Sequence, residues 1–279
     1  MSPLPTAVER WQAQIDARAN QMDAAYAQLG RTSADFWDRR ARGFHRATKD
    51  TVTSDPLFLM LRDEVTPQTS VLDVGAGTGR FCLALAPQAK HVIAVEPSAA
   101  MLDYLRQDIN ARRLTNITLL QTTWQDEPGD LHADIVICSH VLYPIRDVVS
   151  FLEKLRAATL RTCYIYMRGT HIDALSAHLW RHFHGDERQL PPGYIHLLDV
   201  LFEMGIYANV RVVALPPTLR YPSLDVAVEE SLEQLILPTD ERTRSELRPL
   251  LEQWLVERDG MLVPPVKETV SAIIYWTTS

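Results

Sequence analysis

A carboxylate and three closely spaced glycines lie at the ends of two apolar segments. The run Val71-Leu-Asp-Val-Gly-Ala-Gly-Thr-Gly79 enters a glycine turn, and a second apolar run, residues 91–95, ends at Glu96. Glycines let the backbone approach a ligand where a Cβ would clash, and a carboxylate can accept hydrogen bonds from two ribose hydroxyls. This order of strand, turn, helix and strand predicts a binding site for an adenosine-bearing ligand.

The spacing of the glycines distinguishes between cofactors. Dinucleotide enzymes favour G-x-G-x-x-G, whereas Gly75, Gly77 and Gly79 form G-x-G-x-G and Arg80 stands where the last dinucleotide glycine would fall. In this form the segment resembles the first motif of the class I S-adenosylmethionine-dependent methyltransferases. The resemblance covers roughly residues 35–170 in order. It implies a Rossmann-like fold, S-adenosylmethionine as cofactor, and methyl transfer as the reaction.

The resemblance also assigns roles in cofactor binding. It implies that Glu96 binds the ribose and that Asp73 helps to hold the methionine end through its ammonium group. Thr123 and Trp124 stand where the family usually has an Asp that binds the adenine amino group and a small residue. A threonine hydroxyl accepts such a bond more weakly than a carboxylate. The complete set of implied cofactor contacts is Trp37, Phe44, Asp73, Gly75, Ala76, Gly77, Glu96, Pro97, Met101, Thr123, Trp124, Ser139 and His140.

Two aromatic residues precede the glycine turn. Residues 35–44 resemble a helix that stands before the first strand of many small-molecule methyltransferases, where aromatic side chains close over the methionine end of the cofactor. Trp37 and Phe44 are seven residues apart, so they share one helix face. Ordinary core packing gives the same spacing, and both interpretations stay open.

Polar residues that could take part in catalysis follow the fourth and fifth predicted strands. His140 comes directly after residues 134–138, where the resembling family places groups beside the transferred methyl, and its pKa range suits a general base. Its backbone could equally serve only to support the cofactor. Tyr143, Arg168 and His171 are further candidates. A sulfonium is already an activated leaving group, so proximity can supply most of the rate and a catalytic residue is not required.

The elements that position these residues alternate between strands and helices. Apolar runs beginning near 71, 91, 116, 134 and 163 predict strands, and residues 98–112 and 146–159 predict helices. Near-continuous apolar strands indicate a parallel sheet covered on both faces, with ligands at its carboxyl end. The family fold adds strands near 208–215 and 270–277, the last antiparallel, to give a seven-stranded, mostly parallel α/β sheet.

We expect three parts in the chain. Residues 1–50 form a helical arm and cofactor lid, residues 51–170 the S-adenosylmethionine-binding core, and residues 171–279 helical cap insertions with the last two strands. The cap should contain two helices within 171–205 and two more at about 223–236 and 240–258. A helix over residues 6–29 packs on its own domain or, alternatively, forms an arm that covers the active site or pairs with a second subunit as a homodimer.

Histidines are concentrated in the cap. His171, His178 and His182 are spaced as on one helix face, and His178 with His182 could bind a metal ion if a carboxylate from elsewhere, such as Asp199, joined them. No Cys, Asp or Glu shares that face, so pocket-lining or solvated histidines are favoured and no metal is predicted.

Composition restricts the class of partner. The net charge of −7 and the lack of a basic block argue against nucleic acid as the main substrate. Apolar runs are only strand-length and no basic-then-apolar leader precedes them, so we expect no membrane association and a cytoplasmic protein. Cys82, Cys138 and Cys163 fall inside predicted elements, as expected of buried thiols.

The sequence therefore predicts a methyltransferase that acts by in-line displacement on an O, N or C nucleophile of a small molecule. An Asn/Asp-Pro-Pro-Tyr motif, which amino-methylating DNA enzymes carry after the fourth strand, is absent. Two alternatives stay open. An aminopropyltransferase would need further acidic residues after the fourth strand, where Ser139 and His140 supply none. A non-catalytic protein could bind S-adenosylmethionine or S-adenosylhomocysteine as a sensor or subunit.

Overall fold

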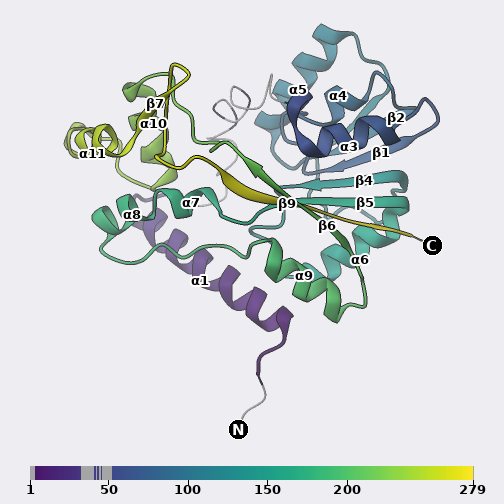
Figure 1. The fold of residues 1–279 in the computed structure, drawn as a ribbon, viewed down its shortest axis with the longest axis horizontal. Helices are drawn as coiled ribbons and strands as arrows, with labels where there is room; N and C mark the ends of the chain where they lie inside the picture. Colours follow the sequence, from purple (N-terminus) through teal and green to yellow (C-terminus); the bar gives the residue numbers. More distant parts are fainter. Residues whose placement is uncertain (1–3, 33–40, 42, 44, 46–51, 279) are drawn as a thin grey trace.

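A seven-stranded sheet forms the centre of the computed structural model, which describes residues 4–32, 41, 43, 45 and 52–278 (Figure 1). The strand order is β3-β2-β1-β4-β5-β9-β6. Strands β1 to β5 pair in parallel, and β9 is antiparallel to both of its neighbours. The predicted seven-stranded, mostly parallel sheet with an antiparallel last strand is confirmed. The strands are β1 (Ser70–Val74), β2 (His91–Val95), β3 (Ile117–Leu120), β4 (Ala133–Ser139), β5 (Thr159–Arg168), β6 (Asn209–Leu215) and β9 (Thr269–Thr277).

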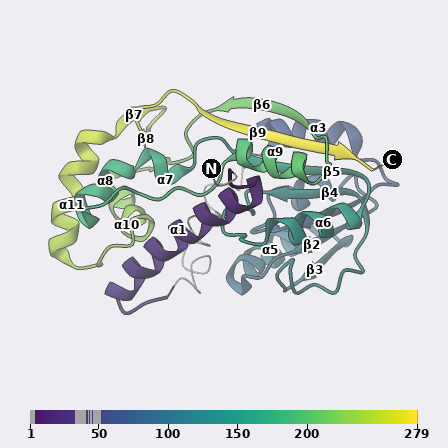
Figure 2. The ribbon, with the colours of Figure 1, turned by 90° about the horizontal axis from the view of Figure 1, so that it is seen from below.

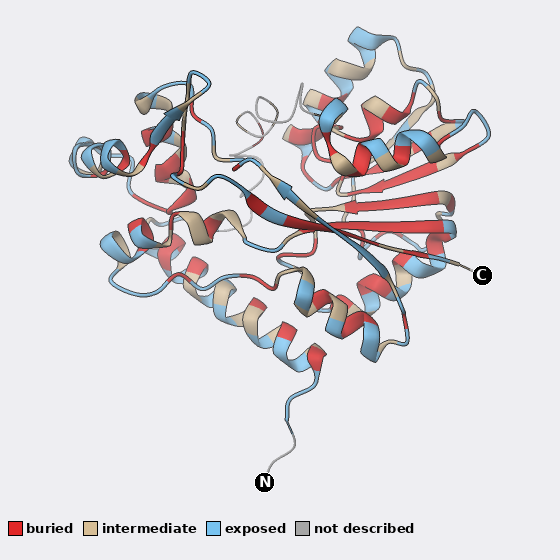
Figure 3. Cartoon of the chain, viewed as in Figure 1, coloured by how far each residue is buried: buried red, intermediate tan, exposed pale blue. Residues whose placement is uncertain are grey.

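Helices cover both faces of this sheet (Figures 1 and 2). One face packs against α3 (Pro56–Glu64), α4 (Cys82–Leu85) and α5 (Ala99–Arg112), which follow the short helix η1 (Val52–Ser54). The other face packs against α6 (Val148–Ala158) and α9 (Tyr194–Glu203). Side chains of β1, β4 and β5 are accordingly buried on both sides, which explains their continuous apolar runs (Figure 3).

Side-chain caps fix where the core helices begin. Ser98 accepts a hydrogen bond from the backbone N–H of Met101, which confirms it as the N-cap of α5. Asp55 and Asp147 cap α3 and α6 in the same way. Each cap satisfies N–H groups that the first helical turn cannot, so the loops that carry ligand contacts leave the strands at defined points.

A helical cap with its own core lies beyond the carboxyl ends of the parallel strands (Figures 1 and 2). It contains α7 (Ile172–Leu175), α8 (Ala177–His184), α10 (Leu224–Gln234), α11 (Glu241–Trp254) and a hairpin of β7 (Val256–Arg258) and β8 (Met261–Val263). Trp180, Leu232 and Leu251 are among the buried residues at its centre.

Two details of the predicted cap were wrong. Residues 171–205 hold three helices instead of two, because the chain bends at Ser176 between α7 and α8. The helix predicted over 240–258 ends at Trp254, since residues 256–263 form the hairpin. Asp259 and Gly260 at its turn both have positive φ, at 51° and 71°, as a two-residue hairpin turn of type I′ requires.

Helix α1 (Ala7–Gln28) connects the sheet to the cap. Trp11 is fully buried in the sheet core, and its indole N–H donates to the carbonyl of Ile145 at 2.7 Å. Tyr26, near the other end of α1, is buried in the cap core. The apolar stripe of this helix is thereby covered within the chain, as in the first of the two interpretations. Among the described residues, no helix has the length and apolar character needed to cross a membrane.

Candidate active site

The glycine turn after β1 is held by the end of β2. The backbone N–H groups of Gly75 and Ala76 both donate to the carbonyl of Val95, at 2.8 and 3.1 Å. The buried Glu96 carboxylate accepts from the N–H of Gly77 through Oε2 and from the N–H of Ser98 through Oε1, each at 2.9 Å. Glu96 therefore joins the turn to the start of α5. A carboxylate oxygen can accept more than one hydrogen bond, so Glu96 can also accept from a ligand hydroxyl.

Gly75 occupies a position that only glycine can take, because its backbone has a positive φ and there is no space for a Cβ. Its φ is +73°, and a Cβ at this position would collide with the side chain of Val141, which follows β4. Glycine avoids the strain and the collision together. Gly77 also has a positive φ, at 56°. At these two positions no side chain stands between the backbone of the turn and an approaching ligand.

Asp73 lies in β1 directly before the turn, and its side chain is buried with no hydrogen-bond partner for Oδ2. Burial raises its pKa to about 7, the backbone N–H of Cys82 opposes this shift, and the nearby Glu96 carboxylate adds to it. A buried carboxyl oxygen without a partner is costly unless a cation or donor approaches it. Asp73 therefore fits a cationic ligand group at this point.

The other predicted cofactor contacts have different surroundings. Pro97 is exposed, whereas Met101 and Ala76 are buried. The Thr123 hydroxyl donates to the Asp126 carboxylate at 2.7 Å. The indole of Trp124 packs against α6, where it donates to the carbonyl of Phe151 and lies under the Lys154 ammonium. Trp124 is thus part of the core, and its role at the adenine stays a prediction. Trp37 and Phe44 lie outside the described residues.

His140 directly follows β4 and has a left-handed backbone, with φ at 60°. Its N–H donates to the carbonyl of Tyr166 at 2.8 Å, and its Nδ1 lies 3.1 Å from the Tyr143 hydroxyl. That hydroxyl in turn accepts from the backbone N–H of Arg168 at 2.8 Å. Burial, together with the guanidinium groups of Arg168 and Arg80, holds the pKa of His140 well below 6.5. His140 is therefore neutral at pH 7.

The Tyr143 hydroxyl influences which nitrogen of His140 carries the proton. Because the hydroxyl already accepts from Arg168, its own proton can be donated to His140 Nδ1. The ring proton then lies on Nε2, and His140 is a hydrogen-bond donor. A general base requires the opposite tautomer, with Nδ1–H donating to Tyr143. Both roles involve contact with the acceptor, and neither requires a charged imidazole.

His171 lies beside Tyr143 and caps α7. The two rings pack edge to face with centroids 4.9 Å apart, and His171 Nδ1 accepts from the N–H of Asp173 at 3.2 Å. Burial lowers the pKa of His171. His140, Tyr143 and His171, predicted as catalytic candidates from separate parts of the sequence, therefore form one contiguous cluster.

Asp173 lies next to His171 and links the cluster to two arginines from other parts of the chain. Its buried carboxylate accepts from Arg18 of α1 at 3.0 Å and from Arg188 at 2.9 Å. Burial by itself would raise the pKa of Asp173, but His171 and these two guanidinium groups hold it well below its ordinary value. No local motif in the sequence marks this group, because its members come from three separate segments of the chain.

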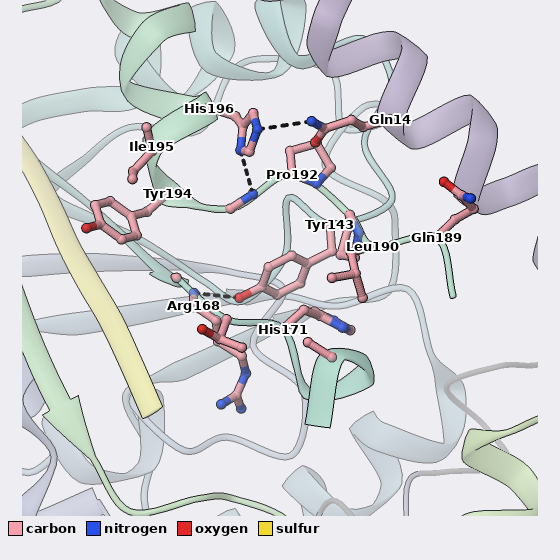
Figure 4. Close-up of a pocket in the computed structure, with 15 residues that line it drawn as sticks. Gln14, Tyr143, Arg168, His171, Gln189, Leu190, Pro192, Tyr194, Ile195 and His196 are labelled. Carbon is pink, nitrogen blue, oxygen red and sulfur yellow. Dashed lines mark hydrogen bonds between the residues drawn. The ribbon is translucent and has the colours of Figure 1, made fainter. Parts of the chain in front are cut away.

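A cavity of about 480 Å³ opens beside the cluster (Figure 4). Tyr143, Arg168 and His171 line one side of it, and the Pro192, Tyr194 and His196 side chains line the other. His196 is held by hydrogen bonds with Gln14 of α1 at 3.0 Å and with the N–H of Gly193 at 3.1 Å. Neither His140 nor the glycine turn lines this cavity, and His140 is connected to it through its contact with Tyr143.

The cap histidines do not form the predicted helix face. His171 precedes α7, whereas His178 and His182 belong to α8, and the bend between these helices separates them. His182 instead lies 3.1 Å from Glu246, and Asp199 pairs with Arg10. Within the described residues, no three His, Cys, Asp or Glu side chains are grouped as metal ligands.

Comparisons with known proteins agree with this geometry. Residues 71–161 match the family model of a methyltransferase domain. A protein of Haemophilus influenzae whose function is uncharacterized is 28% identical over 212 residues, which span 71% of this chain and 75% of that protein. Among solved structures, the YcgJ protein of Bacillus subtilis is 17% identical with a TM-score of 0.51, over 78% of this chain and 94% of its own. The magnesium protoporphyrin IX methyltransferase of Synechocystis, solved with S-adenosylhomocysteine bound, is 12% identical with a TM-score of 0.51, over 94% and 99%. At these identities the structural likeness shows the fold.

Proposed function

We propose that this chain, whose residues 71–161 match the model of a methyltransferase domain, is a class I S-adenosylmethionine-dependent methyltransferase that methylates an oxygen, nitrogen or carbon atom of a small molecule, an activity of enzyme class 2.1.1. The observation that carries this proposal is that two groups of residues, which we call half-sites, lie next to each other at the carboxyl end of the sheet. Glu96, Asp73 and the glycine turn form one half. The cluster of His140, Tyr143 and His171, beside a 480 Å³ cavity, forms the other.

The residues of the first half-site fit S-adenosylmethionine. Glu96 can accept from the ribose hydroxyls, and the unpartnered Oδ2 of Asp73 suits the ammonium group at the methionine end. The positive φ of Gly75 and Gly77 keeps side chains out of the crevice. When bound, the cofactor supplies a methyl group on a sulfonium, so that a nucleophile bonds to the methyl carbon while the carbon–sulfur bond breaks to a neutral thioether.

We expect the affinity for S-adenosylhomocysteine to rise as the pH increases from 5 to about 7. In the free protein the pKa of Asp73 is raised to about 7, so binding of an ammonium group must release its proton below that pH. The dissociation constant should change by up to about tenfold per pH unit. Titration calorimetry between pH 5 and 7 measures this slope, and Asp73→Asn should bind more weakly with no slope.

Asp134→Asn is the matched control for this titration. Asp134 lies in β4, where two hydrogen bonds from Ser70 lower its pKa, so it is ionised throughout the range. The control should keep the wild-type slope. A wild-type affinity that does not depend on pH would contradict the role of Asp73.

The second half-site holds the acceptor. Neutral His140 can contact the acceptor nucleophile through Nε2, either as a donor or, in the other tautomer, as the base that takes its proton. Tyr143 fixes the ring of His140 and forms a wall of the cavity. The walls of the cavity restrict water, and holding the two reactants together supplies most of the rate.

Two measurements test the proposed function. S-adenosylmethionine and S-adenosylhomocysteine should stabilise the protein against thermal unfolding, by about 2.7 kcal/mol at a hundred times the dissociation constant. NAD should give no shift. In a turnover assay with a panel of small hydroxyl and amino compounds, His140→Ala should keep this stabilisation and lose about 10- to 100-fold in rate. His178→Ala, which alters a cap histidine packed on Trp254, should keep both.

The alternatives have distinct outcomes in these assays. Binding of the cofactor without formation of S-adenosylhomocysteine from any acceptor would favour a sensor or subunit. Stabilisation by decarboxylated S-adenosylmethionine alone would favour an aminopropyltransferase. A shift with NAD alone would contradict the methyltransferase assignment.

Localisation and partners are proposed on separate grounds. The three cysteines are free and buried, which fits a reducing compartment such as the cytoplasm. The small cavity and the charge of −7 favour a small-molecule partner over nucleic acid or a membrane surface. A homodimer would need a face other than the apolar stripe of α1, which the chain itself covers.

A further inference from the structure

Arg168 lines the 480 Å³ cavity at the end of β5, and among the described residues its guanidinium makes no hydrogen bond or ion pair. Its backbone is fixed, because its N–H donates to Tyr143 and the N–H of Gly169 donates to Val270 at 2.7 Å. Among the residues that the structure describes, no carboxylate forms an ion pair with Arg168, whereas Arg80 pairs with Asp55. In Figure 4 the Arg168 side chain extends on the same side of Tyr143 as His171.

The groups around Arg168 do not neutralise its charge. Arg18 and Arg188 both pair with the carboxylate of Asp173. Burial lowers the pKa of Arg168, and the Arg80 guanidinium adds to this shift. The imidazoles of His140 and His171 can only be neutral or positive, so neither can serve as a counter-ion. A partly buried, unpaired guanidinium costs free energy that an anionic ligand would recover.

The rest of the cavity has apolar residues beside the polar Gln14, Gln189 and His196. Leu190, Pro191, Pro192, Tyr194 and Ile195 come from one loop and the start of α9, and they face the polar wall. A cavity of this size holds a small molecule, with apolar walls around its body and a few polar groups that orient it. One planar guanidinium matches one carboxylate in charge and in its two parallel hydrogen bonds.

We propose that the methyl acceptor is a small carboxylic acid with an apolar body, and that Arg168 binds its carboxylate. This inference rests on the proposed function, since it describes the acceptor of the same reaction. Arg168 would set specificity and orientation by holding the acid end of the acceptor, so that its nucleophile lies against His140.

The test uses benzoate and its neutral analogue benzamide, titrated calorimetrically into protein saturated with S-adenosylhomocysteine. Benzoate should bind the wild type, and benzamide should bind more weakly. Arg168→Met should lose about 10- to 150-fold in benzoate affinity, as expected for hydrogen bonds to a charged group. Arg161→Met, at the exposed opposite end of β5, should bind benzoate like the wild type.

Each contrary result has a defined meaning. Equal binding of benzoate and benzamide, no benzoate binding, or unchanged binding by Arg168→Met would overturn the proposal. Tighter binding of phenyl phosphate than of benzoate would replace the carboxylate by a phosphate. Loss of S-adenosylhomocysteine affinity in Arg168→Met would mean that Arg168 holds the carboxylate of the cofactor. Failure of the wild type to bind S-adenosylhomocysteine at all would instead contradict the proposed function, and it is measured before benzoate is added.

Discussion

Replacing Glu96 with alanine is expected to weaken the binding of S-adenosylhomocysteine by about 5- to 150-fold, which corresponds to about 1–3 kcal/mol. Two losses contribute. The ribose hydroxyls lose a charged acceptor, and the N–H groups of Gly77 and Ser98 lose the carboxylate that holds them at 2.9 Å. Calorimetric titration of both proteins measures the change. Asp103→Ala, on the exposed side of α5, should have no effect.

A second ligand pair separates these two losses. If Glu96 contacts the ribose, the wild type should prefer adenosine over 2′-deoxyadenosine, and Glu96→Ala should lose that preference. If Glu96 only organises the glycine turn, both nucleosides should weaken equally and the preference should remain. Retention of full affinity for S-adenosylhomocysteine would exclude both roles.

Asp173→Asn is expected to lower the free energy of unfolding by about 3–5 kcal/mol, because it leaves the buried guanidinium groups of Arg18 and Arg188 without their carboxylate. Urea denaturation measures this difference. Asp16→Asn is a matched control, since Asp16 also links α1 to the core through an ion pair with Arg146, but at an exposed position. That change should cost less than about 1 kcal/mol.

The pH dependence gives the prediction for Asp173 a direction. The pKa of Asp173 is held well below its ordinary value of 3.8 in the folded protein, so its stabilisation is fully present above that pH. It is lost only as the pH falls through the folded pKa. The penalty of Asp173→Asn should therefore be constant between pH 5 and 7. Equal penalties for Asp173→Asn and Asp16→Asn would contradict the buried network.

The sheet could be predicted from the sequence because its signals are local. The apolar runs of β1 to β5 are continuous. Ser98 and the glycine turn mark where neighbouring elements begin and end, because helix capping and positive φ act over only a few residues. The boundaries of β2 agree with the predicted run at both ends. The grouping of His140 with Tyr143 also follows from spacing, since both residues lie in the loop after β4.

The acceptor half of the site could not be predicted in the same way. Asp173 interacts with Arg18, which is 155 residues away in the sequence, and with Arg188, which is 15 residues away. Hydrophobic periodicity does not predict contacts of this kind. The bend at Ser176, which separates the cap histidines, lies between two short helices that helical spacing alone joins into one. The packing of the Trp124 indole on α6 is also a contact between separate segments, 27 residues apart in the sequence.

The connection that α1 makes between sheet and cap has a consequence for the order of folding during synthesis. The hydrogen-bond partner of the Trp11 indole is the carbonyl of Ile145, 134 residues later in the chain. The partner of the Ala7 N–H is the Glu203 carboxylate, 196 residues later. At about 5–20 residues per second, a ribosome reaches the first of these partners roughly 7 to 27 seconds after Trp11. Until then Trp11 lacks this native hydrogen bond. The helix is therefore made early, and its native contacts with the sheet and the cap are completed late.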